Sequence, residues 1–165
     1  MKLPLVPVLE TKRLKLIPLK ESHAKAMFKV LANEKLYEFT GGKPPESIER
    51  LTEKYKFLQS RFSPDKKELW LNWIIFLNKK DPIGYVQATV SEKMISIAWV
   101  VGVDFQGFGF ATESAKEMVK WLRGNFSTKI IACVNPNHFA SQKVAKNIGL
   151  KLTNEIIESE EVWTL

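Results

Sequence analysis

The sequence predicts an α/β fold, in which one mixed β-sheet carries helices on both faces, and three observations support it. Segments rich in β-branched and aromatic residues occur three times in succession between residues 69 and 103, as in an antiparallel meander. Apolar residues then recur at helical spacing from Ala111 onward. The segment "KIIACV" follows, and its unbroken apolar character is typical of a strand in a parallel arrangement. With 165 residues, of which 45% are hydrophobic, residues 1–165 are predicted to form a single domain.

The first part of the chain is predicted to contain one strand and two helices. In "RLKLIP", Leu14 and Leu16 alternate with basic residues, which indicates a half-buried strand. Ser22 is placed to cap the first helix. After a break at "GGKPPES", a longer helix is predicted to end before Pro64. Its apolar stripe consists of Ile48, Leu51, Tyr55, Leu58 and Phe62.

The rest of the chain alternates between strands and helices. The strands "LWLNWIIFL" and "IGYVQATV" are joined by a turn at "NKKDP", and "MISIAWVVGV" completes the meander. The helix from Ala111 is predicted to end near Gly124, and a second helix in "NHFASQKVAKNI" to end at Gly149. With "LKLTNEII" and "VWTL" as closing strands, the predicted order is β-α-α-β-β-β-α-β-α-β-β.

Composition narrows the classes of partner and compartment. The chain has 25 Lys and Arg against 18 Asp and Glu, a net charge of +7, which serves solubility or attracts phosphorylated cofactors, nucleic acid, acidic peptides or anionic lipid. The opening "MKLPLVPVLE" is broken by prolines and no long apolar run follows, so we expect a soluble cytoplasmic protein without membrane contact. Cys133 is expected to be a buried structural thiol. The two histidines and this cysteine show no ligand spacing, so no metal site is predicted.

The stretch "QGFGFA" lies between a predicted strand and a predicted helix. The start of a helix offers unpaired backbone N–H groups and a positive dipole end, which favour phosphate oxygens. A plain strand-to-helix turn is the alternative. A Walker A loop requires Gly-Lys-Ser/Thr, and a Rossmann fingerprint requires Gly or Ala where Thr112 stands, so neither motif fits.

The run "FQGFGFATESA" resembles the pyrophosphate-binding motif of the GNAT N-acetyltransferases, in the branch related to RimJ and RimL. "LETKRLKLIPL" is similar to the opening strand of that branch, and "NHFASQKVAKNIGL" to its last helix. The resemblance extends over essentially the whole chain in the same order. It implies an acyl-CoA N-acyltransferase fold.

The resemblance also implies acetyl-CoA as donor and an amine as acceptor, with direct attack in a ternary complex and no metal. The diphosphate would bind N–H groups between Gln106 and Thr112, and the pantetheine arm would pair with backbone near Val101 and Val103. The N–H near Val101 would polarise the thioester carbonyl. The coenzyme-binding residues that it implies are Val101, Val103, Gln106, Gly107, Phe108, Gly109, Phe110, Ala111, Thr112 and His138.

The catalytic groups depart from the family pattern. Ala145 stands where many members carry a tyrosine acid, and Ser96 stands where many carry a glutamate. Ser141 is the candidate hydroxyl for the leaving thiolate, with capping or back-bonding within its helix as the alternative. His138 is a candidate base, with coenzyme contact or helix-end polarity as alternatives. The candidate wall of the acceptor cleft consists of Tyr37, Phe39 and Trp73.

The sequence is compatible with two other functions. One is a non-catalytic acyl-CoA sensor, because the tyrosine and glutamate are absent. The other is a basic RNA- or ribosome-binding module, although the chain has no RNP-like aromatic pair or GXXG loop. A protein N-terminus and a small-molecule amine are both compatible with the sequence as acceptors, and so are a monomer and a homodimer.

Overall fold

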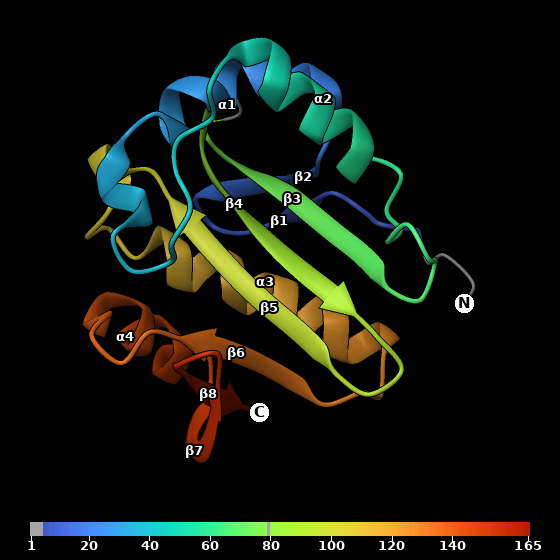
Figure 1. Ribbon diagram of the computed structural model, residues 1–165, viewed down its shortest axis with the longest axis vertical. Coiled ribbons are helices and arrows are strands. Elements are labelled where there is room, and N and C mark those ends of the chain that lie inside the picture. Colours follow the sequence, from blue (N-terminus) through green and yellow to red (C-terminus); the bar gives the residue numbers. More distant parts are fainter. Residues whose placement is uncertain (1–4, 79) are drawn as a thin grey trace.

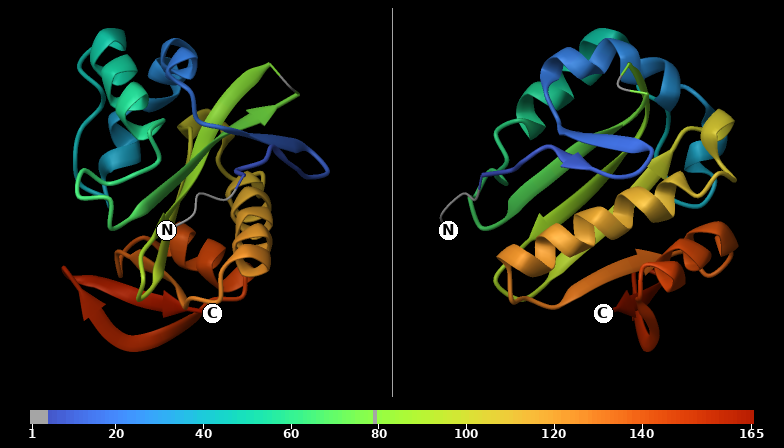
Figure 2. Two further views of the ribbon diagram at one scale, coloured as in Figure 1. Left: turned by 90° about the vertical axis from the view of Figure 1, so that its right-hand side faces the viewer. Right: turned by 180° about the vertical axis from the view of Figure 1, so that it is seen from behind.

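The computed structural model describes residues 5–78 and 80–165, and it shows one mixed eight-stranded sheet between two layers of helices (Figures 1 and 2). Two helices, α1 and α2, cover one face of the sheet, and α3 and α4 lie on the other. The helices are α1 (Ala24–Leu31), α2 (Ile48–Leu58), α3 (Phe110–Asn125) and α4 (Phe139–Asn147), with short 3₁₀ helices η1 (Glu21–His23), η2 (Glu34–Tyr37) and η3 (Val103–Phe105).

The strands follow the predicted order, with one addition at the N-terminal end. They are β1 (Leu9–Glu10), β2 (Leu14–Pro18), β3 (Leu69–Leu77), β4 (Asp81–Val90), β5 (Ile95–Val101), β6 (Ile130–Val134), β7 (Lys151–Ile157) and β8 (Glu160–Thr164). In the sheet they lie in the order β1-β2-β3-β4-β5-β6-β8-β7. The meander β3-β4-β5 and the parallel pairing of β6 with β5 are confirmed. Lys79, in the predicted turn "NKKDP", lies outside the described residues.

Helix boundaries differ from the predictions at two places. Ser22 does not cap α1, because it lies inside η1. α2 begins after Ser47, whose Oγ accepts a hydrogen bond from the Arg50 N–H at 3.1 Å, and this cap was not predicted. α2 ends at Leu58, so Phe62 is not part of its stripe; instead it forms a β-bridge with Leu69.

Two apolar cores follow from the alternation of side chains along the strands. The larger core packs the back of the sheet against α3 and α4, and the smaller one packs the front of the sheet against α1 and α2. Trp73 belongs to the larger core: it is fully buried, its ring meets Trp121 edge to face, and its N–H donates to the Pro7 carbonyl at 2.9 Å.

The strands β5 and β6 separate after a short contact. They pair only at Ile95 with Ile130 and at Ser96 with Ile131, and beyond this point the ribbons diverge (Figure 1). Along the second half of β5 the backbone ladder of the sheet is therefore split in a V shape, and this split between β5 and β6 is called the opening below. Within the described residues, no helix is long and apolar enough to cross a membrane.

Candidate functional site

The glycine loop connects β5 to α3 beside this opening. Gly107 and Gly109 have φ angles of +85° and +80°, which side chains adopt only at a cost, so the backbone itself requires glycine there. A Cβ added at Gly107 would meet nothing within 4 Å. The space next to the loop is therefore free for a ligand to approach the backbone.

The start of α3 supplies hydrogen-bond donors to the same space. The first helical bond runs from the Glu113 N–H to the Gly109 carbonyl at 3.0 Å. The N–H groups of Phe110, Ala111 and Thr112 precede that bond and have no carbonyl of their own turn to bind. Together with the positive end of the helix dipole they favour an anionic group at this position.

Arg13, at the β1–β2 turn, holds the glycine loop in place, a role that was not predicted. Its guanidinium pairs with the Glu113 carboxylate at 2.7 Å and donates from Nη1 to the Phe108 carbonyl at 2.9 Å. It also lies 4.5 Å from the centre of the Phe110 ring. Burial would raise the pKa of Glu113, but hydrogen bonds from Thr11 and Arg13 outweigh it and lower this pKa. Glu113 therefore stays ionised, and the guanidinium of Arg13 balances its negative charge at the start of α3.

The open edge of β5 carries backbone groups directed toward the gap. Gly102 N–H bonds to Ile83 on β4, whereas Ile95 N–H bonds to Lys129 on the β6 side. By the alternation of an antiparallel strand, the N–H groups of Ile97, Trp99 and Val101 also point away from β4, toward the opening.

The Gln106 side chain connects the loop to this edge. Its Nε2 donates to the Val101 carbonyl at 3.0 Å. Val103 lies in η3 rather than on the strand, so the open edge ends at Val101. Phe108 is 62% exposed and stacks on Phe110, whose own side chain is buried in the larger core.

The predicted residues His138 and Phe39 meet at the far side of the opening. Their rings stack with centroids 4.6 Å apart, and Asn135 Nδ2 donates to the Phe39 carbonyl at 3.4 Å. Burial lowers the pKa of His138, while the nearby Glu38 carboxylate opposes this effect. Ser141 lies in the first turn of α4, and its hydroxyl forms no hydrogen bond with the described residues, unlike Ser114, which bonds back to its own helix.

A cavity of about 230 Å³ lies between α1, η2 and α2 on one side and the front of β3 and β4 on the other. Tyr37 lines it, and its hydroxyl donates to the Leu31 carbonyl at 2.9 Å. Phe39 does not line it. The prediction for Trp73 is wrong, because the parity of β3 directs this side chain to the opposite face of the sheet. The complete lining is Leu19, Leu31, Tyr37, Lys43, Pro45, Arg50, Leu51, Lys54, Tyr55, Leu58, Asn72, Tyr85 and Gln87.

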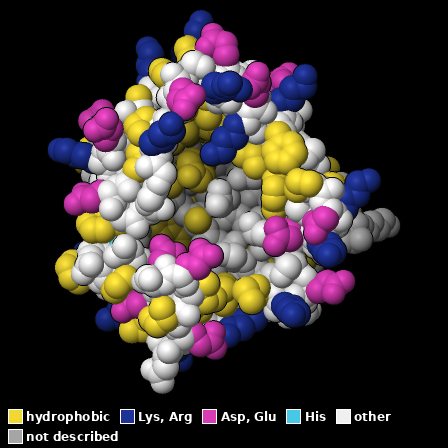
Figure 3. Space-filling model, in the orientation of Figure 1, with side chains coloured by type: hydrophobic (Ala, Val, Ile, Leu, Met, Phe, Trp, Pro, Cys, Tyr) yellow, Lys and Arg dark blue, Asp and Glu magenta, His cyan; other side chains and the backbone are white. Residues whose placement is uncertain are grey.

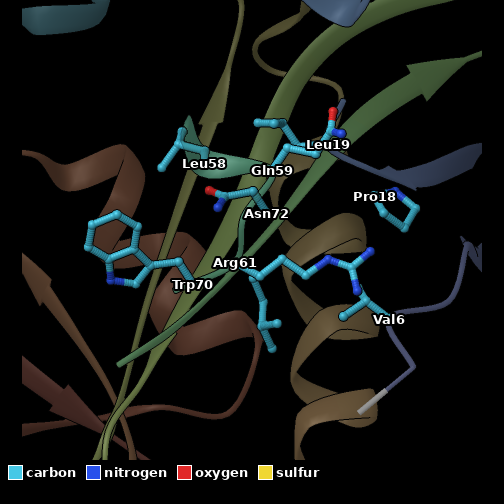
Figure 4. A pocket seen from close by; sticks show the side chains of 9 residues that line it. Val6, Pro18, Leu19, Leu58, Gln59, Arg61, Trp70 and Asn72 are labelled. Atoms are coloured by element: carbon cyan, nitrogen blue, oxygen red, sulfur yellow. The ribbon is translucent and has the colours of Figure 1, made fainter. Parts of the chain in front are cut away.

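A second cavity is too small for a substrate. It has a volume of about 10 Å³, space for roughly one water molecule. Figure 4 shows it beside Val6 and Pro18, where the side chains of Arg61 and Trp70 project in opposite directions. The larger cavity is therefore the candidate acceptor pocket.

Carboxylates from the β7–β8 hairpin face the front of the sheet. Cys133 pairs with Val162, and neither belongs to the core against α3, so Glu160, two residues before Val162, shares their face. Burial and then Glu158 raise the pKa of Glu160, and burial followed by both carboxylates raises the pKa of the Cys133 thiol. Cys133 is half-buried rather than buried, and its thiol is protonated at neutral pH.

Among the described residues, no three His, Cys, Asp or Glu side chains are grouped to hold a metal ion.

Comparison with known proteins decides the family. Residues 13–151 match the family model described as "Acetyltransferase (GNAT) domain". The chain belongs to the GNAT acetyltransferase family. No match was found among curated protein sequences.

Solved structures of acetyltransferases share the fold at low sequence identity. RimL, a ribosomal-protein alpha-N-acetyltransferase in complex with coenzyme A, has a TM-score of 0.78 at 18% identity, with 96% of this chain and 97% of that chain covered. The microcin self-immunity acetyltransferase MccE, in complex with acetyl-CoA and AMP, has a TM-score of 0.79 at 15% identity, with 98% and 97% covered. A GNAT acetyltransferase from Bacillus anthracis has a TM-score of 0.74 at 16% identity, with 96% and 98% covered. These similarities confirm the predicted GNAT fold.

Proposed function

We propose that this GNAT domain transfers an acetyl group from acetyl-CoA to a primary amine, on a protein N-terminus or a small molecule, by direct attack in a ternary complex. One observation carries the proposal: the bare glycine loop at the start of α3 and the open edge of β5 meet at Val101. A diphosphate on the loop and an amide-bearing arm along the edge require this combination.

Each part of the coenzyme has a complementary group in this arrangement. The N–H groups between Gln106 and Thr112 would hold the diphosphate, with Arg13 fixing the loop. The N–H groups along β5 would pair with the pantetheine arm, and that of Val101 would polarise the thioester carbonyl. In the reaction a C–N bond forms, the C–S bond breaks, the amine loses a proton and the thiolate gains one.

Three side chains are the candidates to handle these protons. His138 has a lowered pKa and is neutral at pH 7, so its ring is able to accept the amine proton. Glu160, on the same sheet face as Cys133, has a raised pKa and is the second candidate base. The hydroxyl of Ser141, which forms no hydrogen bond with the residues that the structure describes, is the candidate donor to the leaving thiolate.

The first test is calorimetric titration of acetyl-CoA into the wild-type protein and two loop variants. Gly109→Glu and Phe108→Glu each place a negative charge at the diphosphate site, and the second does so without the strain of a positive φ. We expect binding in the micromolar range for the wild type and its loss in both variants. Gly124→Glu is the matched control: it lies at the other end of α3, where a Cβ meets nothing within 4 Å. Equal affinity for all four proteins would contradict the proposal.

A non-catalytic acyl-CoA sensor is the alternative function, and one observation favours it. Ala145, which stands where many relatives carry the tyrosine acid, is fully buried, so no side chain there reaches the coenzyme. Release of free thiol from acetyl-CoA in the presence of an amine panel distinguishes the two functions. Binding of acetyl-CoA without amine-dependent thiol release would favour the sensor.

A further inference from the structure

We propose that the acceptor amine carries an anionic group, a carboxylate or a phosphate, which binds Lys43, Arg50 and Lys54 at the larger cavity. The inference rests on the proposed function, because it names the class of substrate for the same site. Its basis is the charge, the free polar groups and the position of this cavity.

All the charged residues that line the cavity are basic. Arg50 and Lys54 are four residues apart and so share a face of α2, and Lys43 comes from the preceding loop. No Asp or Glu is among the lining residues. Figure 3 shows a hollow on this face, with Lys and Arg side chains along its edge over α2 and Asp and Glu side chains on the opposite side, over the β7–β8 hairpin. A cationic acceptor would be repelled from the α2 side.

Carboxylates that lie outside the lining pair with two of the three basic side chains and offset part of their charge. Lys43 pairs with Glu46 at 2.8 Å and Arg50 with Glu53 at 3.2 Å, and all four side chains are well exposed, so these pairs are weak. Lys54 forms no salt bridge with any residue that the structure describes.

The floor of the cavity offers neutral hydrogen-bond donors. The side-chain amides of Asn72 and Gln87 and the hydroxyls of Tyr55 and Tyr85 form no hydrogen bond with the described residues. Burial raises the pKa of Tyr85 to about 12, so it keeps its proton at neutral pH. The oxygen atoms of a carboxylate or phosphate accept hydrogen bonds from such groups. Hydrogen bonds in which one partner is charged are stronger than those between neutral groups.

The register of the sheet sets the distance from anion to amine. Asn72 pairs with Gln87, which pairs with Ala98 on β5 beside the opening. Since neighbouring strands are about 4.8 Å apart, the floor lies roughly 5–10 Å from the open edge. An acceptor molecule with its anionic group on the floor of the cavity and its amine at the open edge of β5 has several bonds between these two groups. A carboxylate on the same carbon as the amine would lie over β5, beyond the reach of α2.

The test compares matched acceptors in a thiol-release assay with saturating acetyl-CoA. One arm pairs the peptide Ala-Glu-Gly amide with Ala-Gln-Gly amide, and the other pairs 3-aminopropyl phosphate with 3-aminopropanol. We expect the anionic member of at least one pair to have a kcat/KM about tenfold higher or more, mainly through KM, because one ion-paired contact of this kind corresponds to a tenfold change. The favoured arm identifies the source of the anion as peptide or small molecule.

Variants test whether the preference for anionic acceptors arises at the cavity. Lys54→Ala and Arg50→Gln are expected to reduce the anionic preference severalfold, and both residues are exposed enough for the fold to tolerate the change. Lys56→Ala, on the same helix but outside the cavity, is expected to leave it unchanged.

Two results would overturn the inference while leaving acetyl transfer intact: equal kcat/KM within both pairs, or a preference that survives Lys54→Ala and Arg50→Gln. Failure of acetyl-CoA to bind in the calorimetric experiment would instead overturn the proposed function, and this inference with it.

Discussion

Arg13→Ala is the change that tests most directly how the glycine loop is held. The substitution removes the pair with Glu113, the hydrogen bond to the Phe108 carbonyl and the contact with the Phe110 ring. Glu113 then keeps only the hydroxyl of Thr11 and the backbone N–H of residue 13, at 2.6 and 3.0 Å. Both stability and coenzyme affinity are expected to fall, because the loop loses its attachment to β1–β2.

The size of the loss follows from these contacts. The Arg13 side chain is 42% exposed, so its ion pair contributes less than about 1 kcal/mol. The hydrogen bond to a carbonyl contributes roughly 1 kcal/mol, and the cation–π contact about 0.5 kcal/mol. A total of about 2 kcal/mol corresponds to a fall of about 4–8 °C in Tm for a domain of this size.

Thermal unfolding followed by circular dichroism measures this change, and Lys12→Ala, at an exposed neighbouring position, is the control. The pH dependence gives a second readout. Because the folded protein holds the pKa of Glu113 below its ordinary value of 4.5, the wild-type advantage is present above that pH and disappears as the pH falls through the lowered pKa. An Arg13→Ala protein with the Tm of the Lys12→Ala control at pH 7 would refute this account of the loop.

Three further outcomes are expected. Gly84→Ala places a Cβ against the Val100 carbonyl oxygen on the next strand, and should lower the free energy of unfolding in urea by about 2 kcal/mol or more; an unchanged midpoint would contradict the described register. Ser47→Ala removes the cap of α2 and should cost about 1 kcal/mol by the same measurement, with Ser47→Asp retaining most of the stability. His138→Gln should remove an acid-side inflection below pH 6.5 from the profile of kcat/KM, since the lowered pKa leaves the ring neutral above it; an identical profile would exclude His138 as the base.

The sheet could be predicted because its pattern is local. The segment at 69–77 is rich in β-branched and aromatic residues, which favour a strand through their local preferences. "KIIACV" is apolar at successive positions because β6 lies between β5 and β8. The glycine loop was also predicted, because a backbone with positive φ favours glycine and the two such positions appear in the sequence as Gly107 and Gly109. The prediction for Trp73 was wrong because the alternation of side chains along β3 does not tell which face of the strand lies against α1 and α2.

The missed features depend on contacts between distant segments. Arg13 and Glu113 are 100 residues apart, and each reads as an ordinary surface charge in its own segment. Phe62 continues the apolar stripe of α2 at the right spacing, yet the helix has already ended and the ring packs at the sheet instead. The pairing of Phe39 with His138 likewise exists only after the sheet has formed.

The short contact between β5 and β6 has a consequence for dynamics. A ligand that fills the V-shaped opening with its own amide groups acts as a substitute strand, in the manner of β-augmentation. The backbone amide hydrogens of Ile97, Trp99 and Val101 would then exchange slowly with solvent in the complex and quickly without it. Binding also couples to folding: a ligand present at about 100 times its Kd stabilises the domain by about 2.7 kcal/mol. The free energy of unfolding of this protein thus depends on the concentration of the coenzyme that would fill the opening.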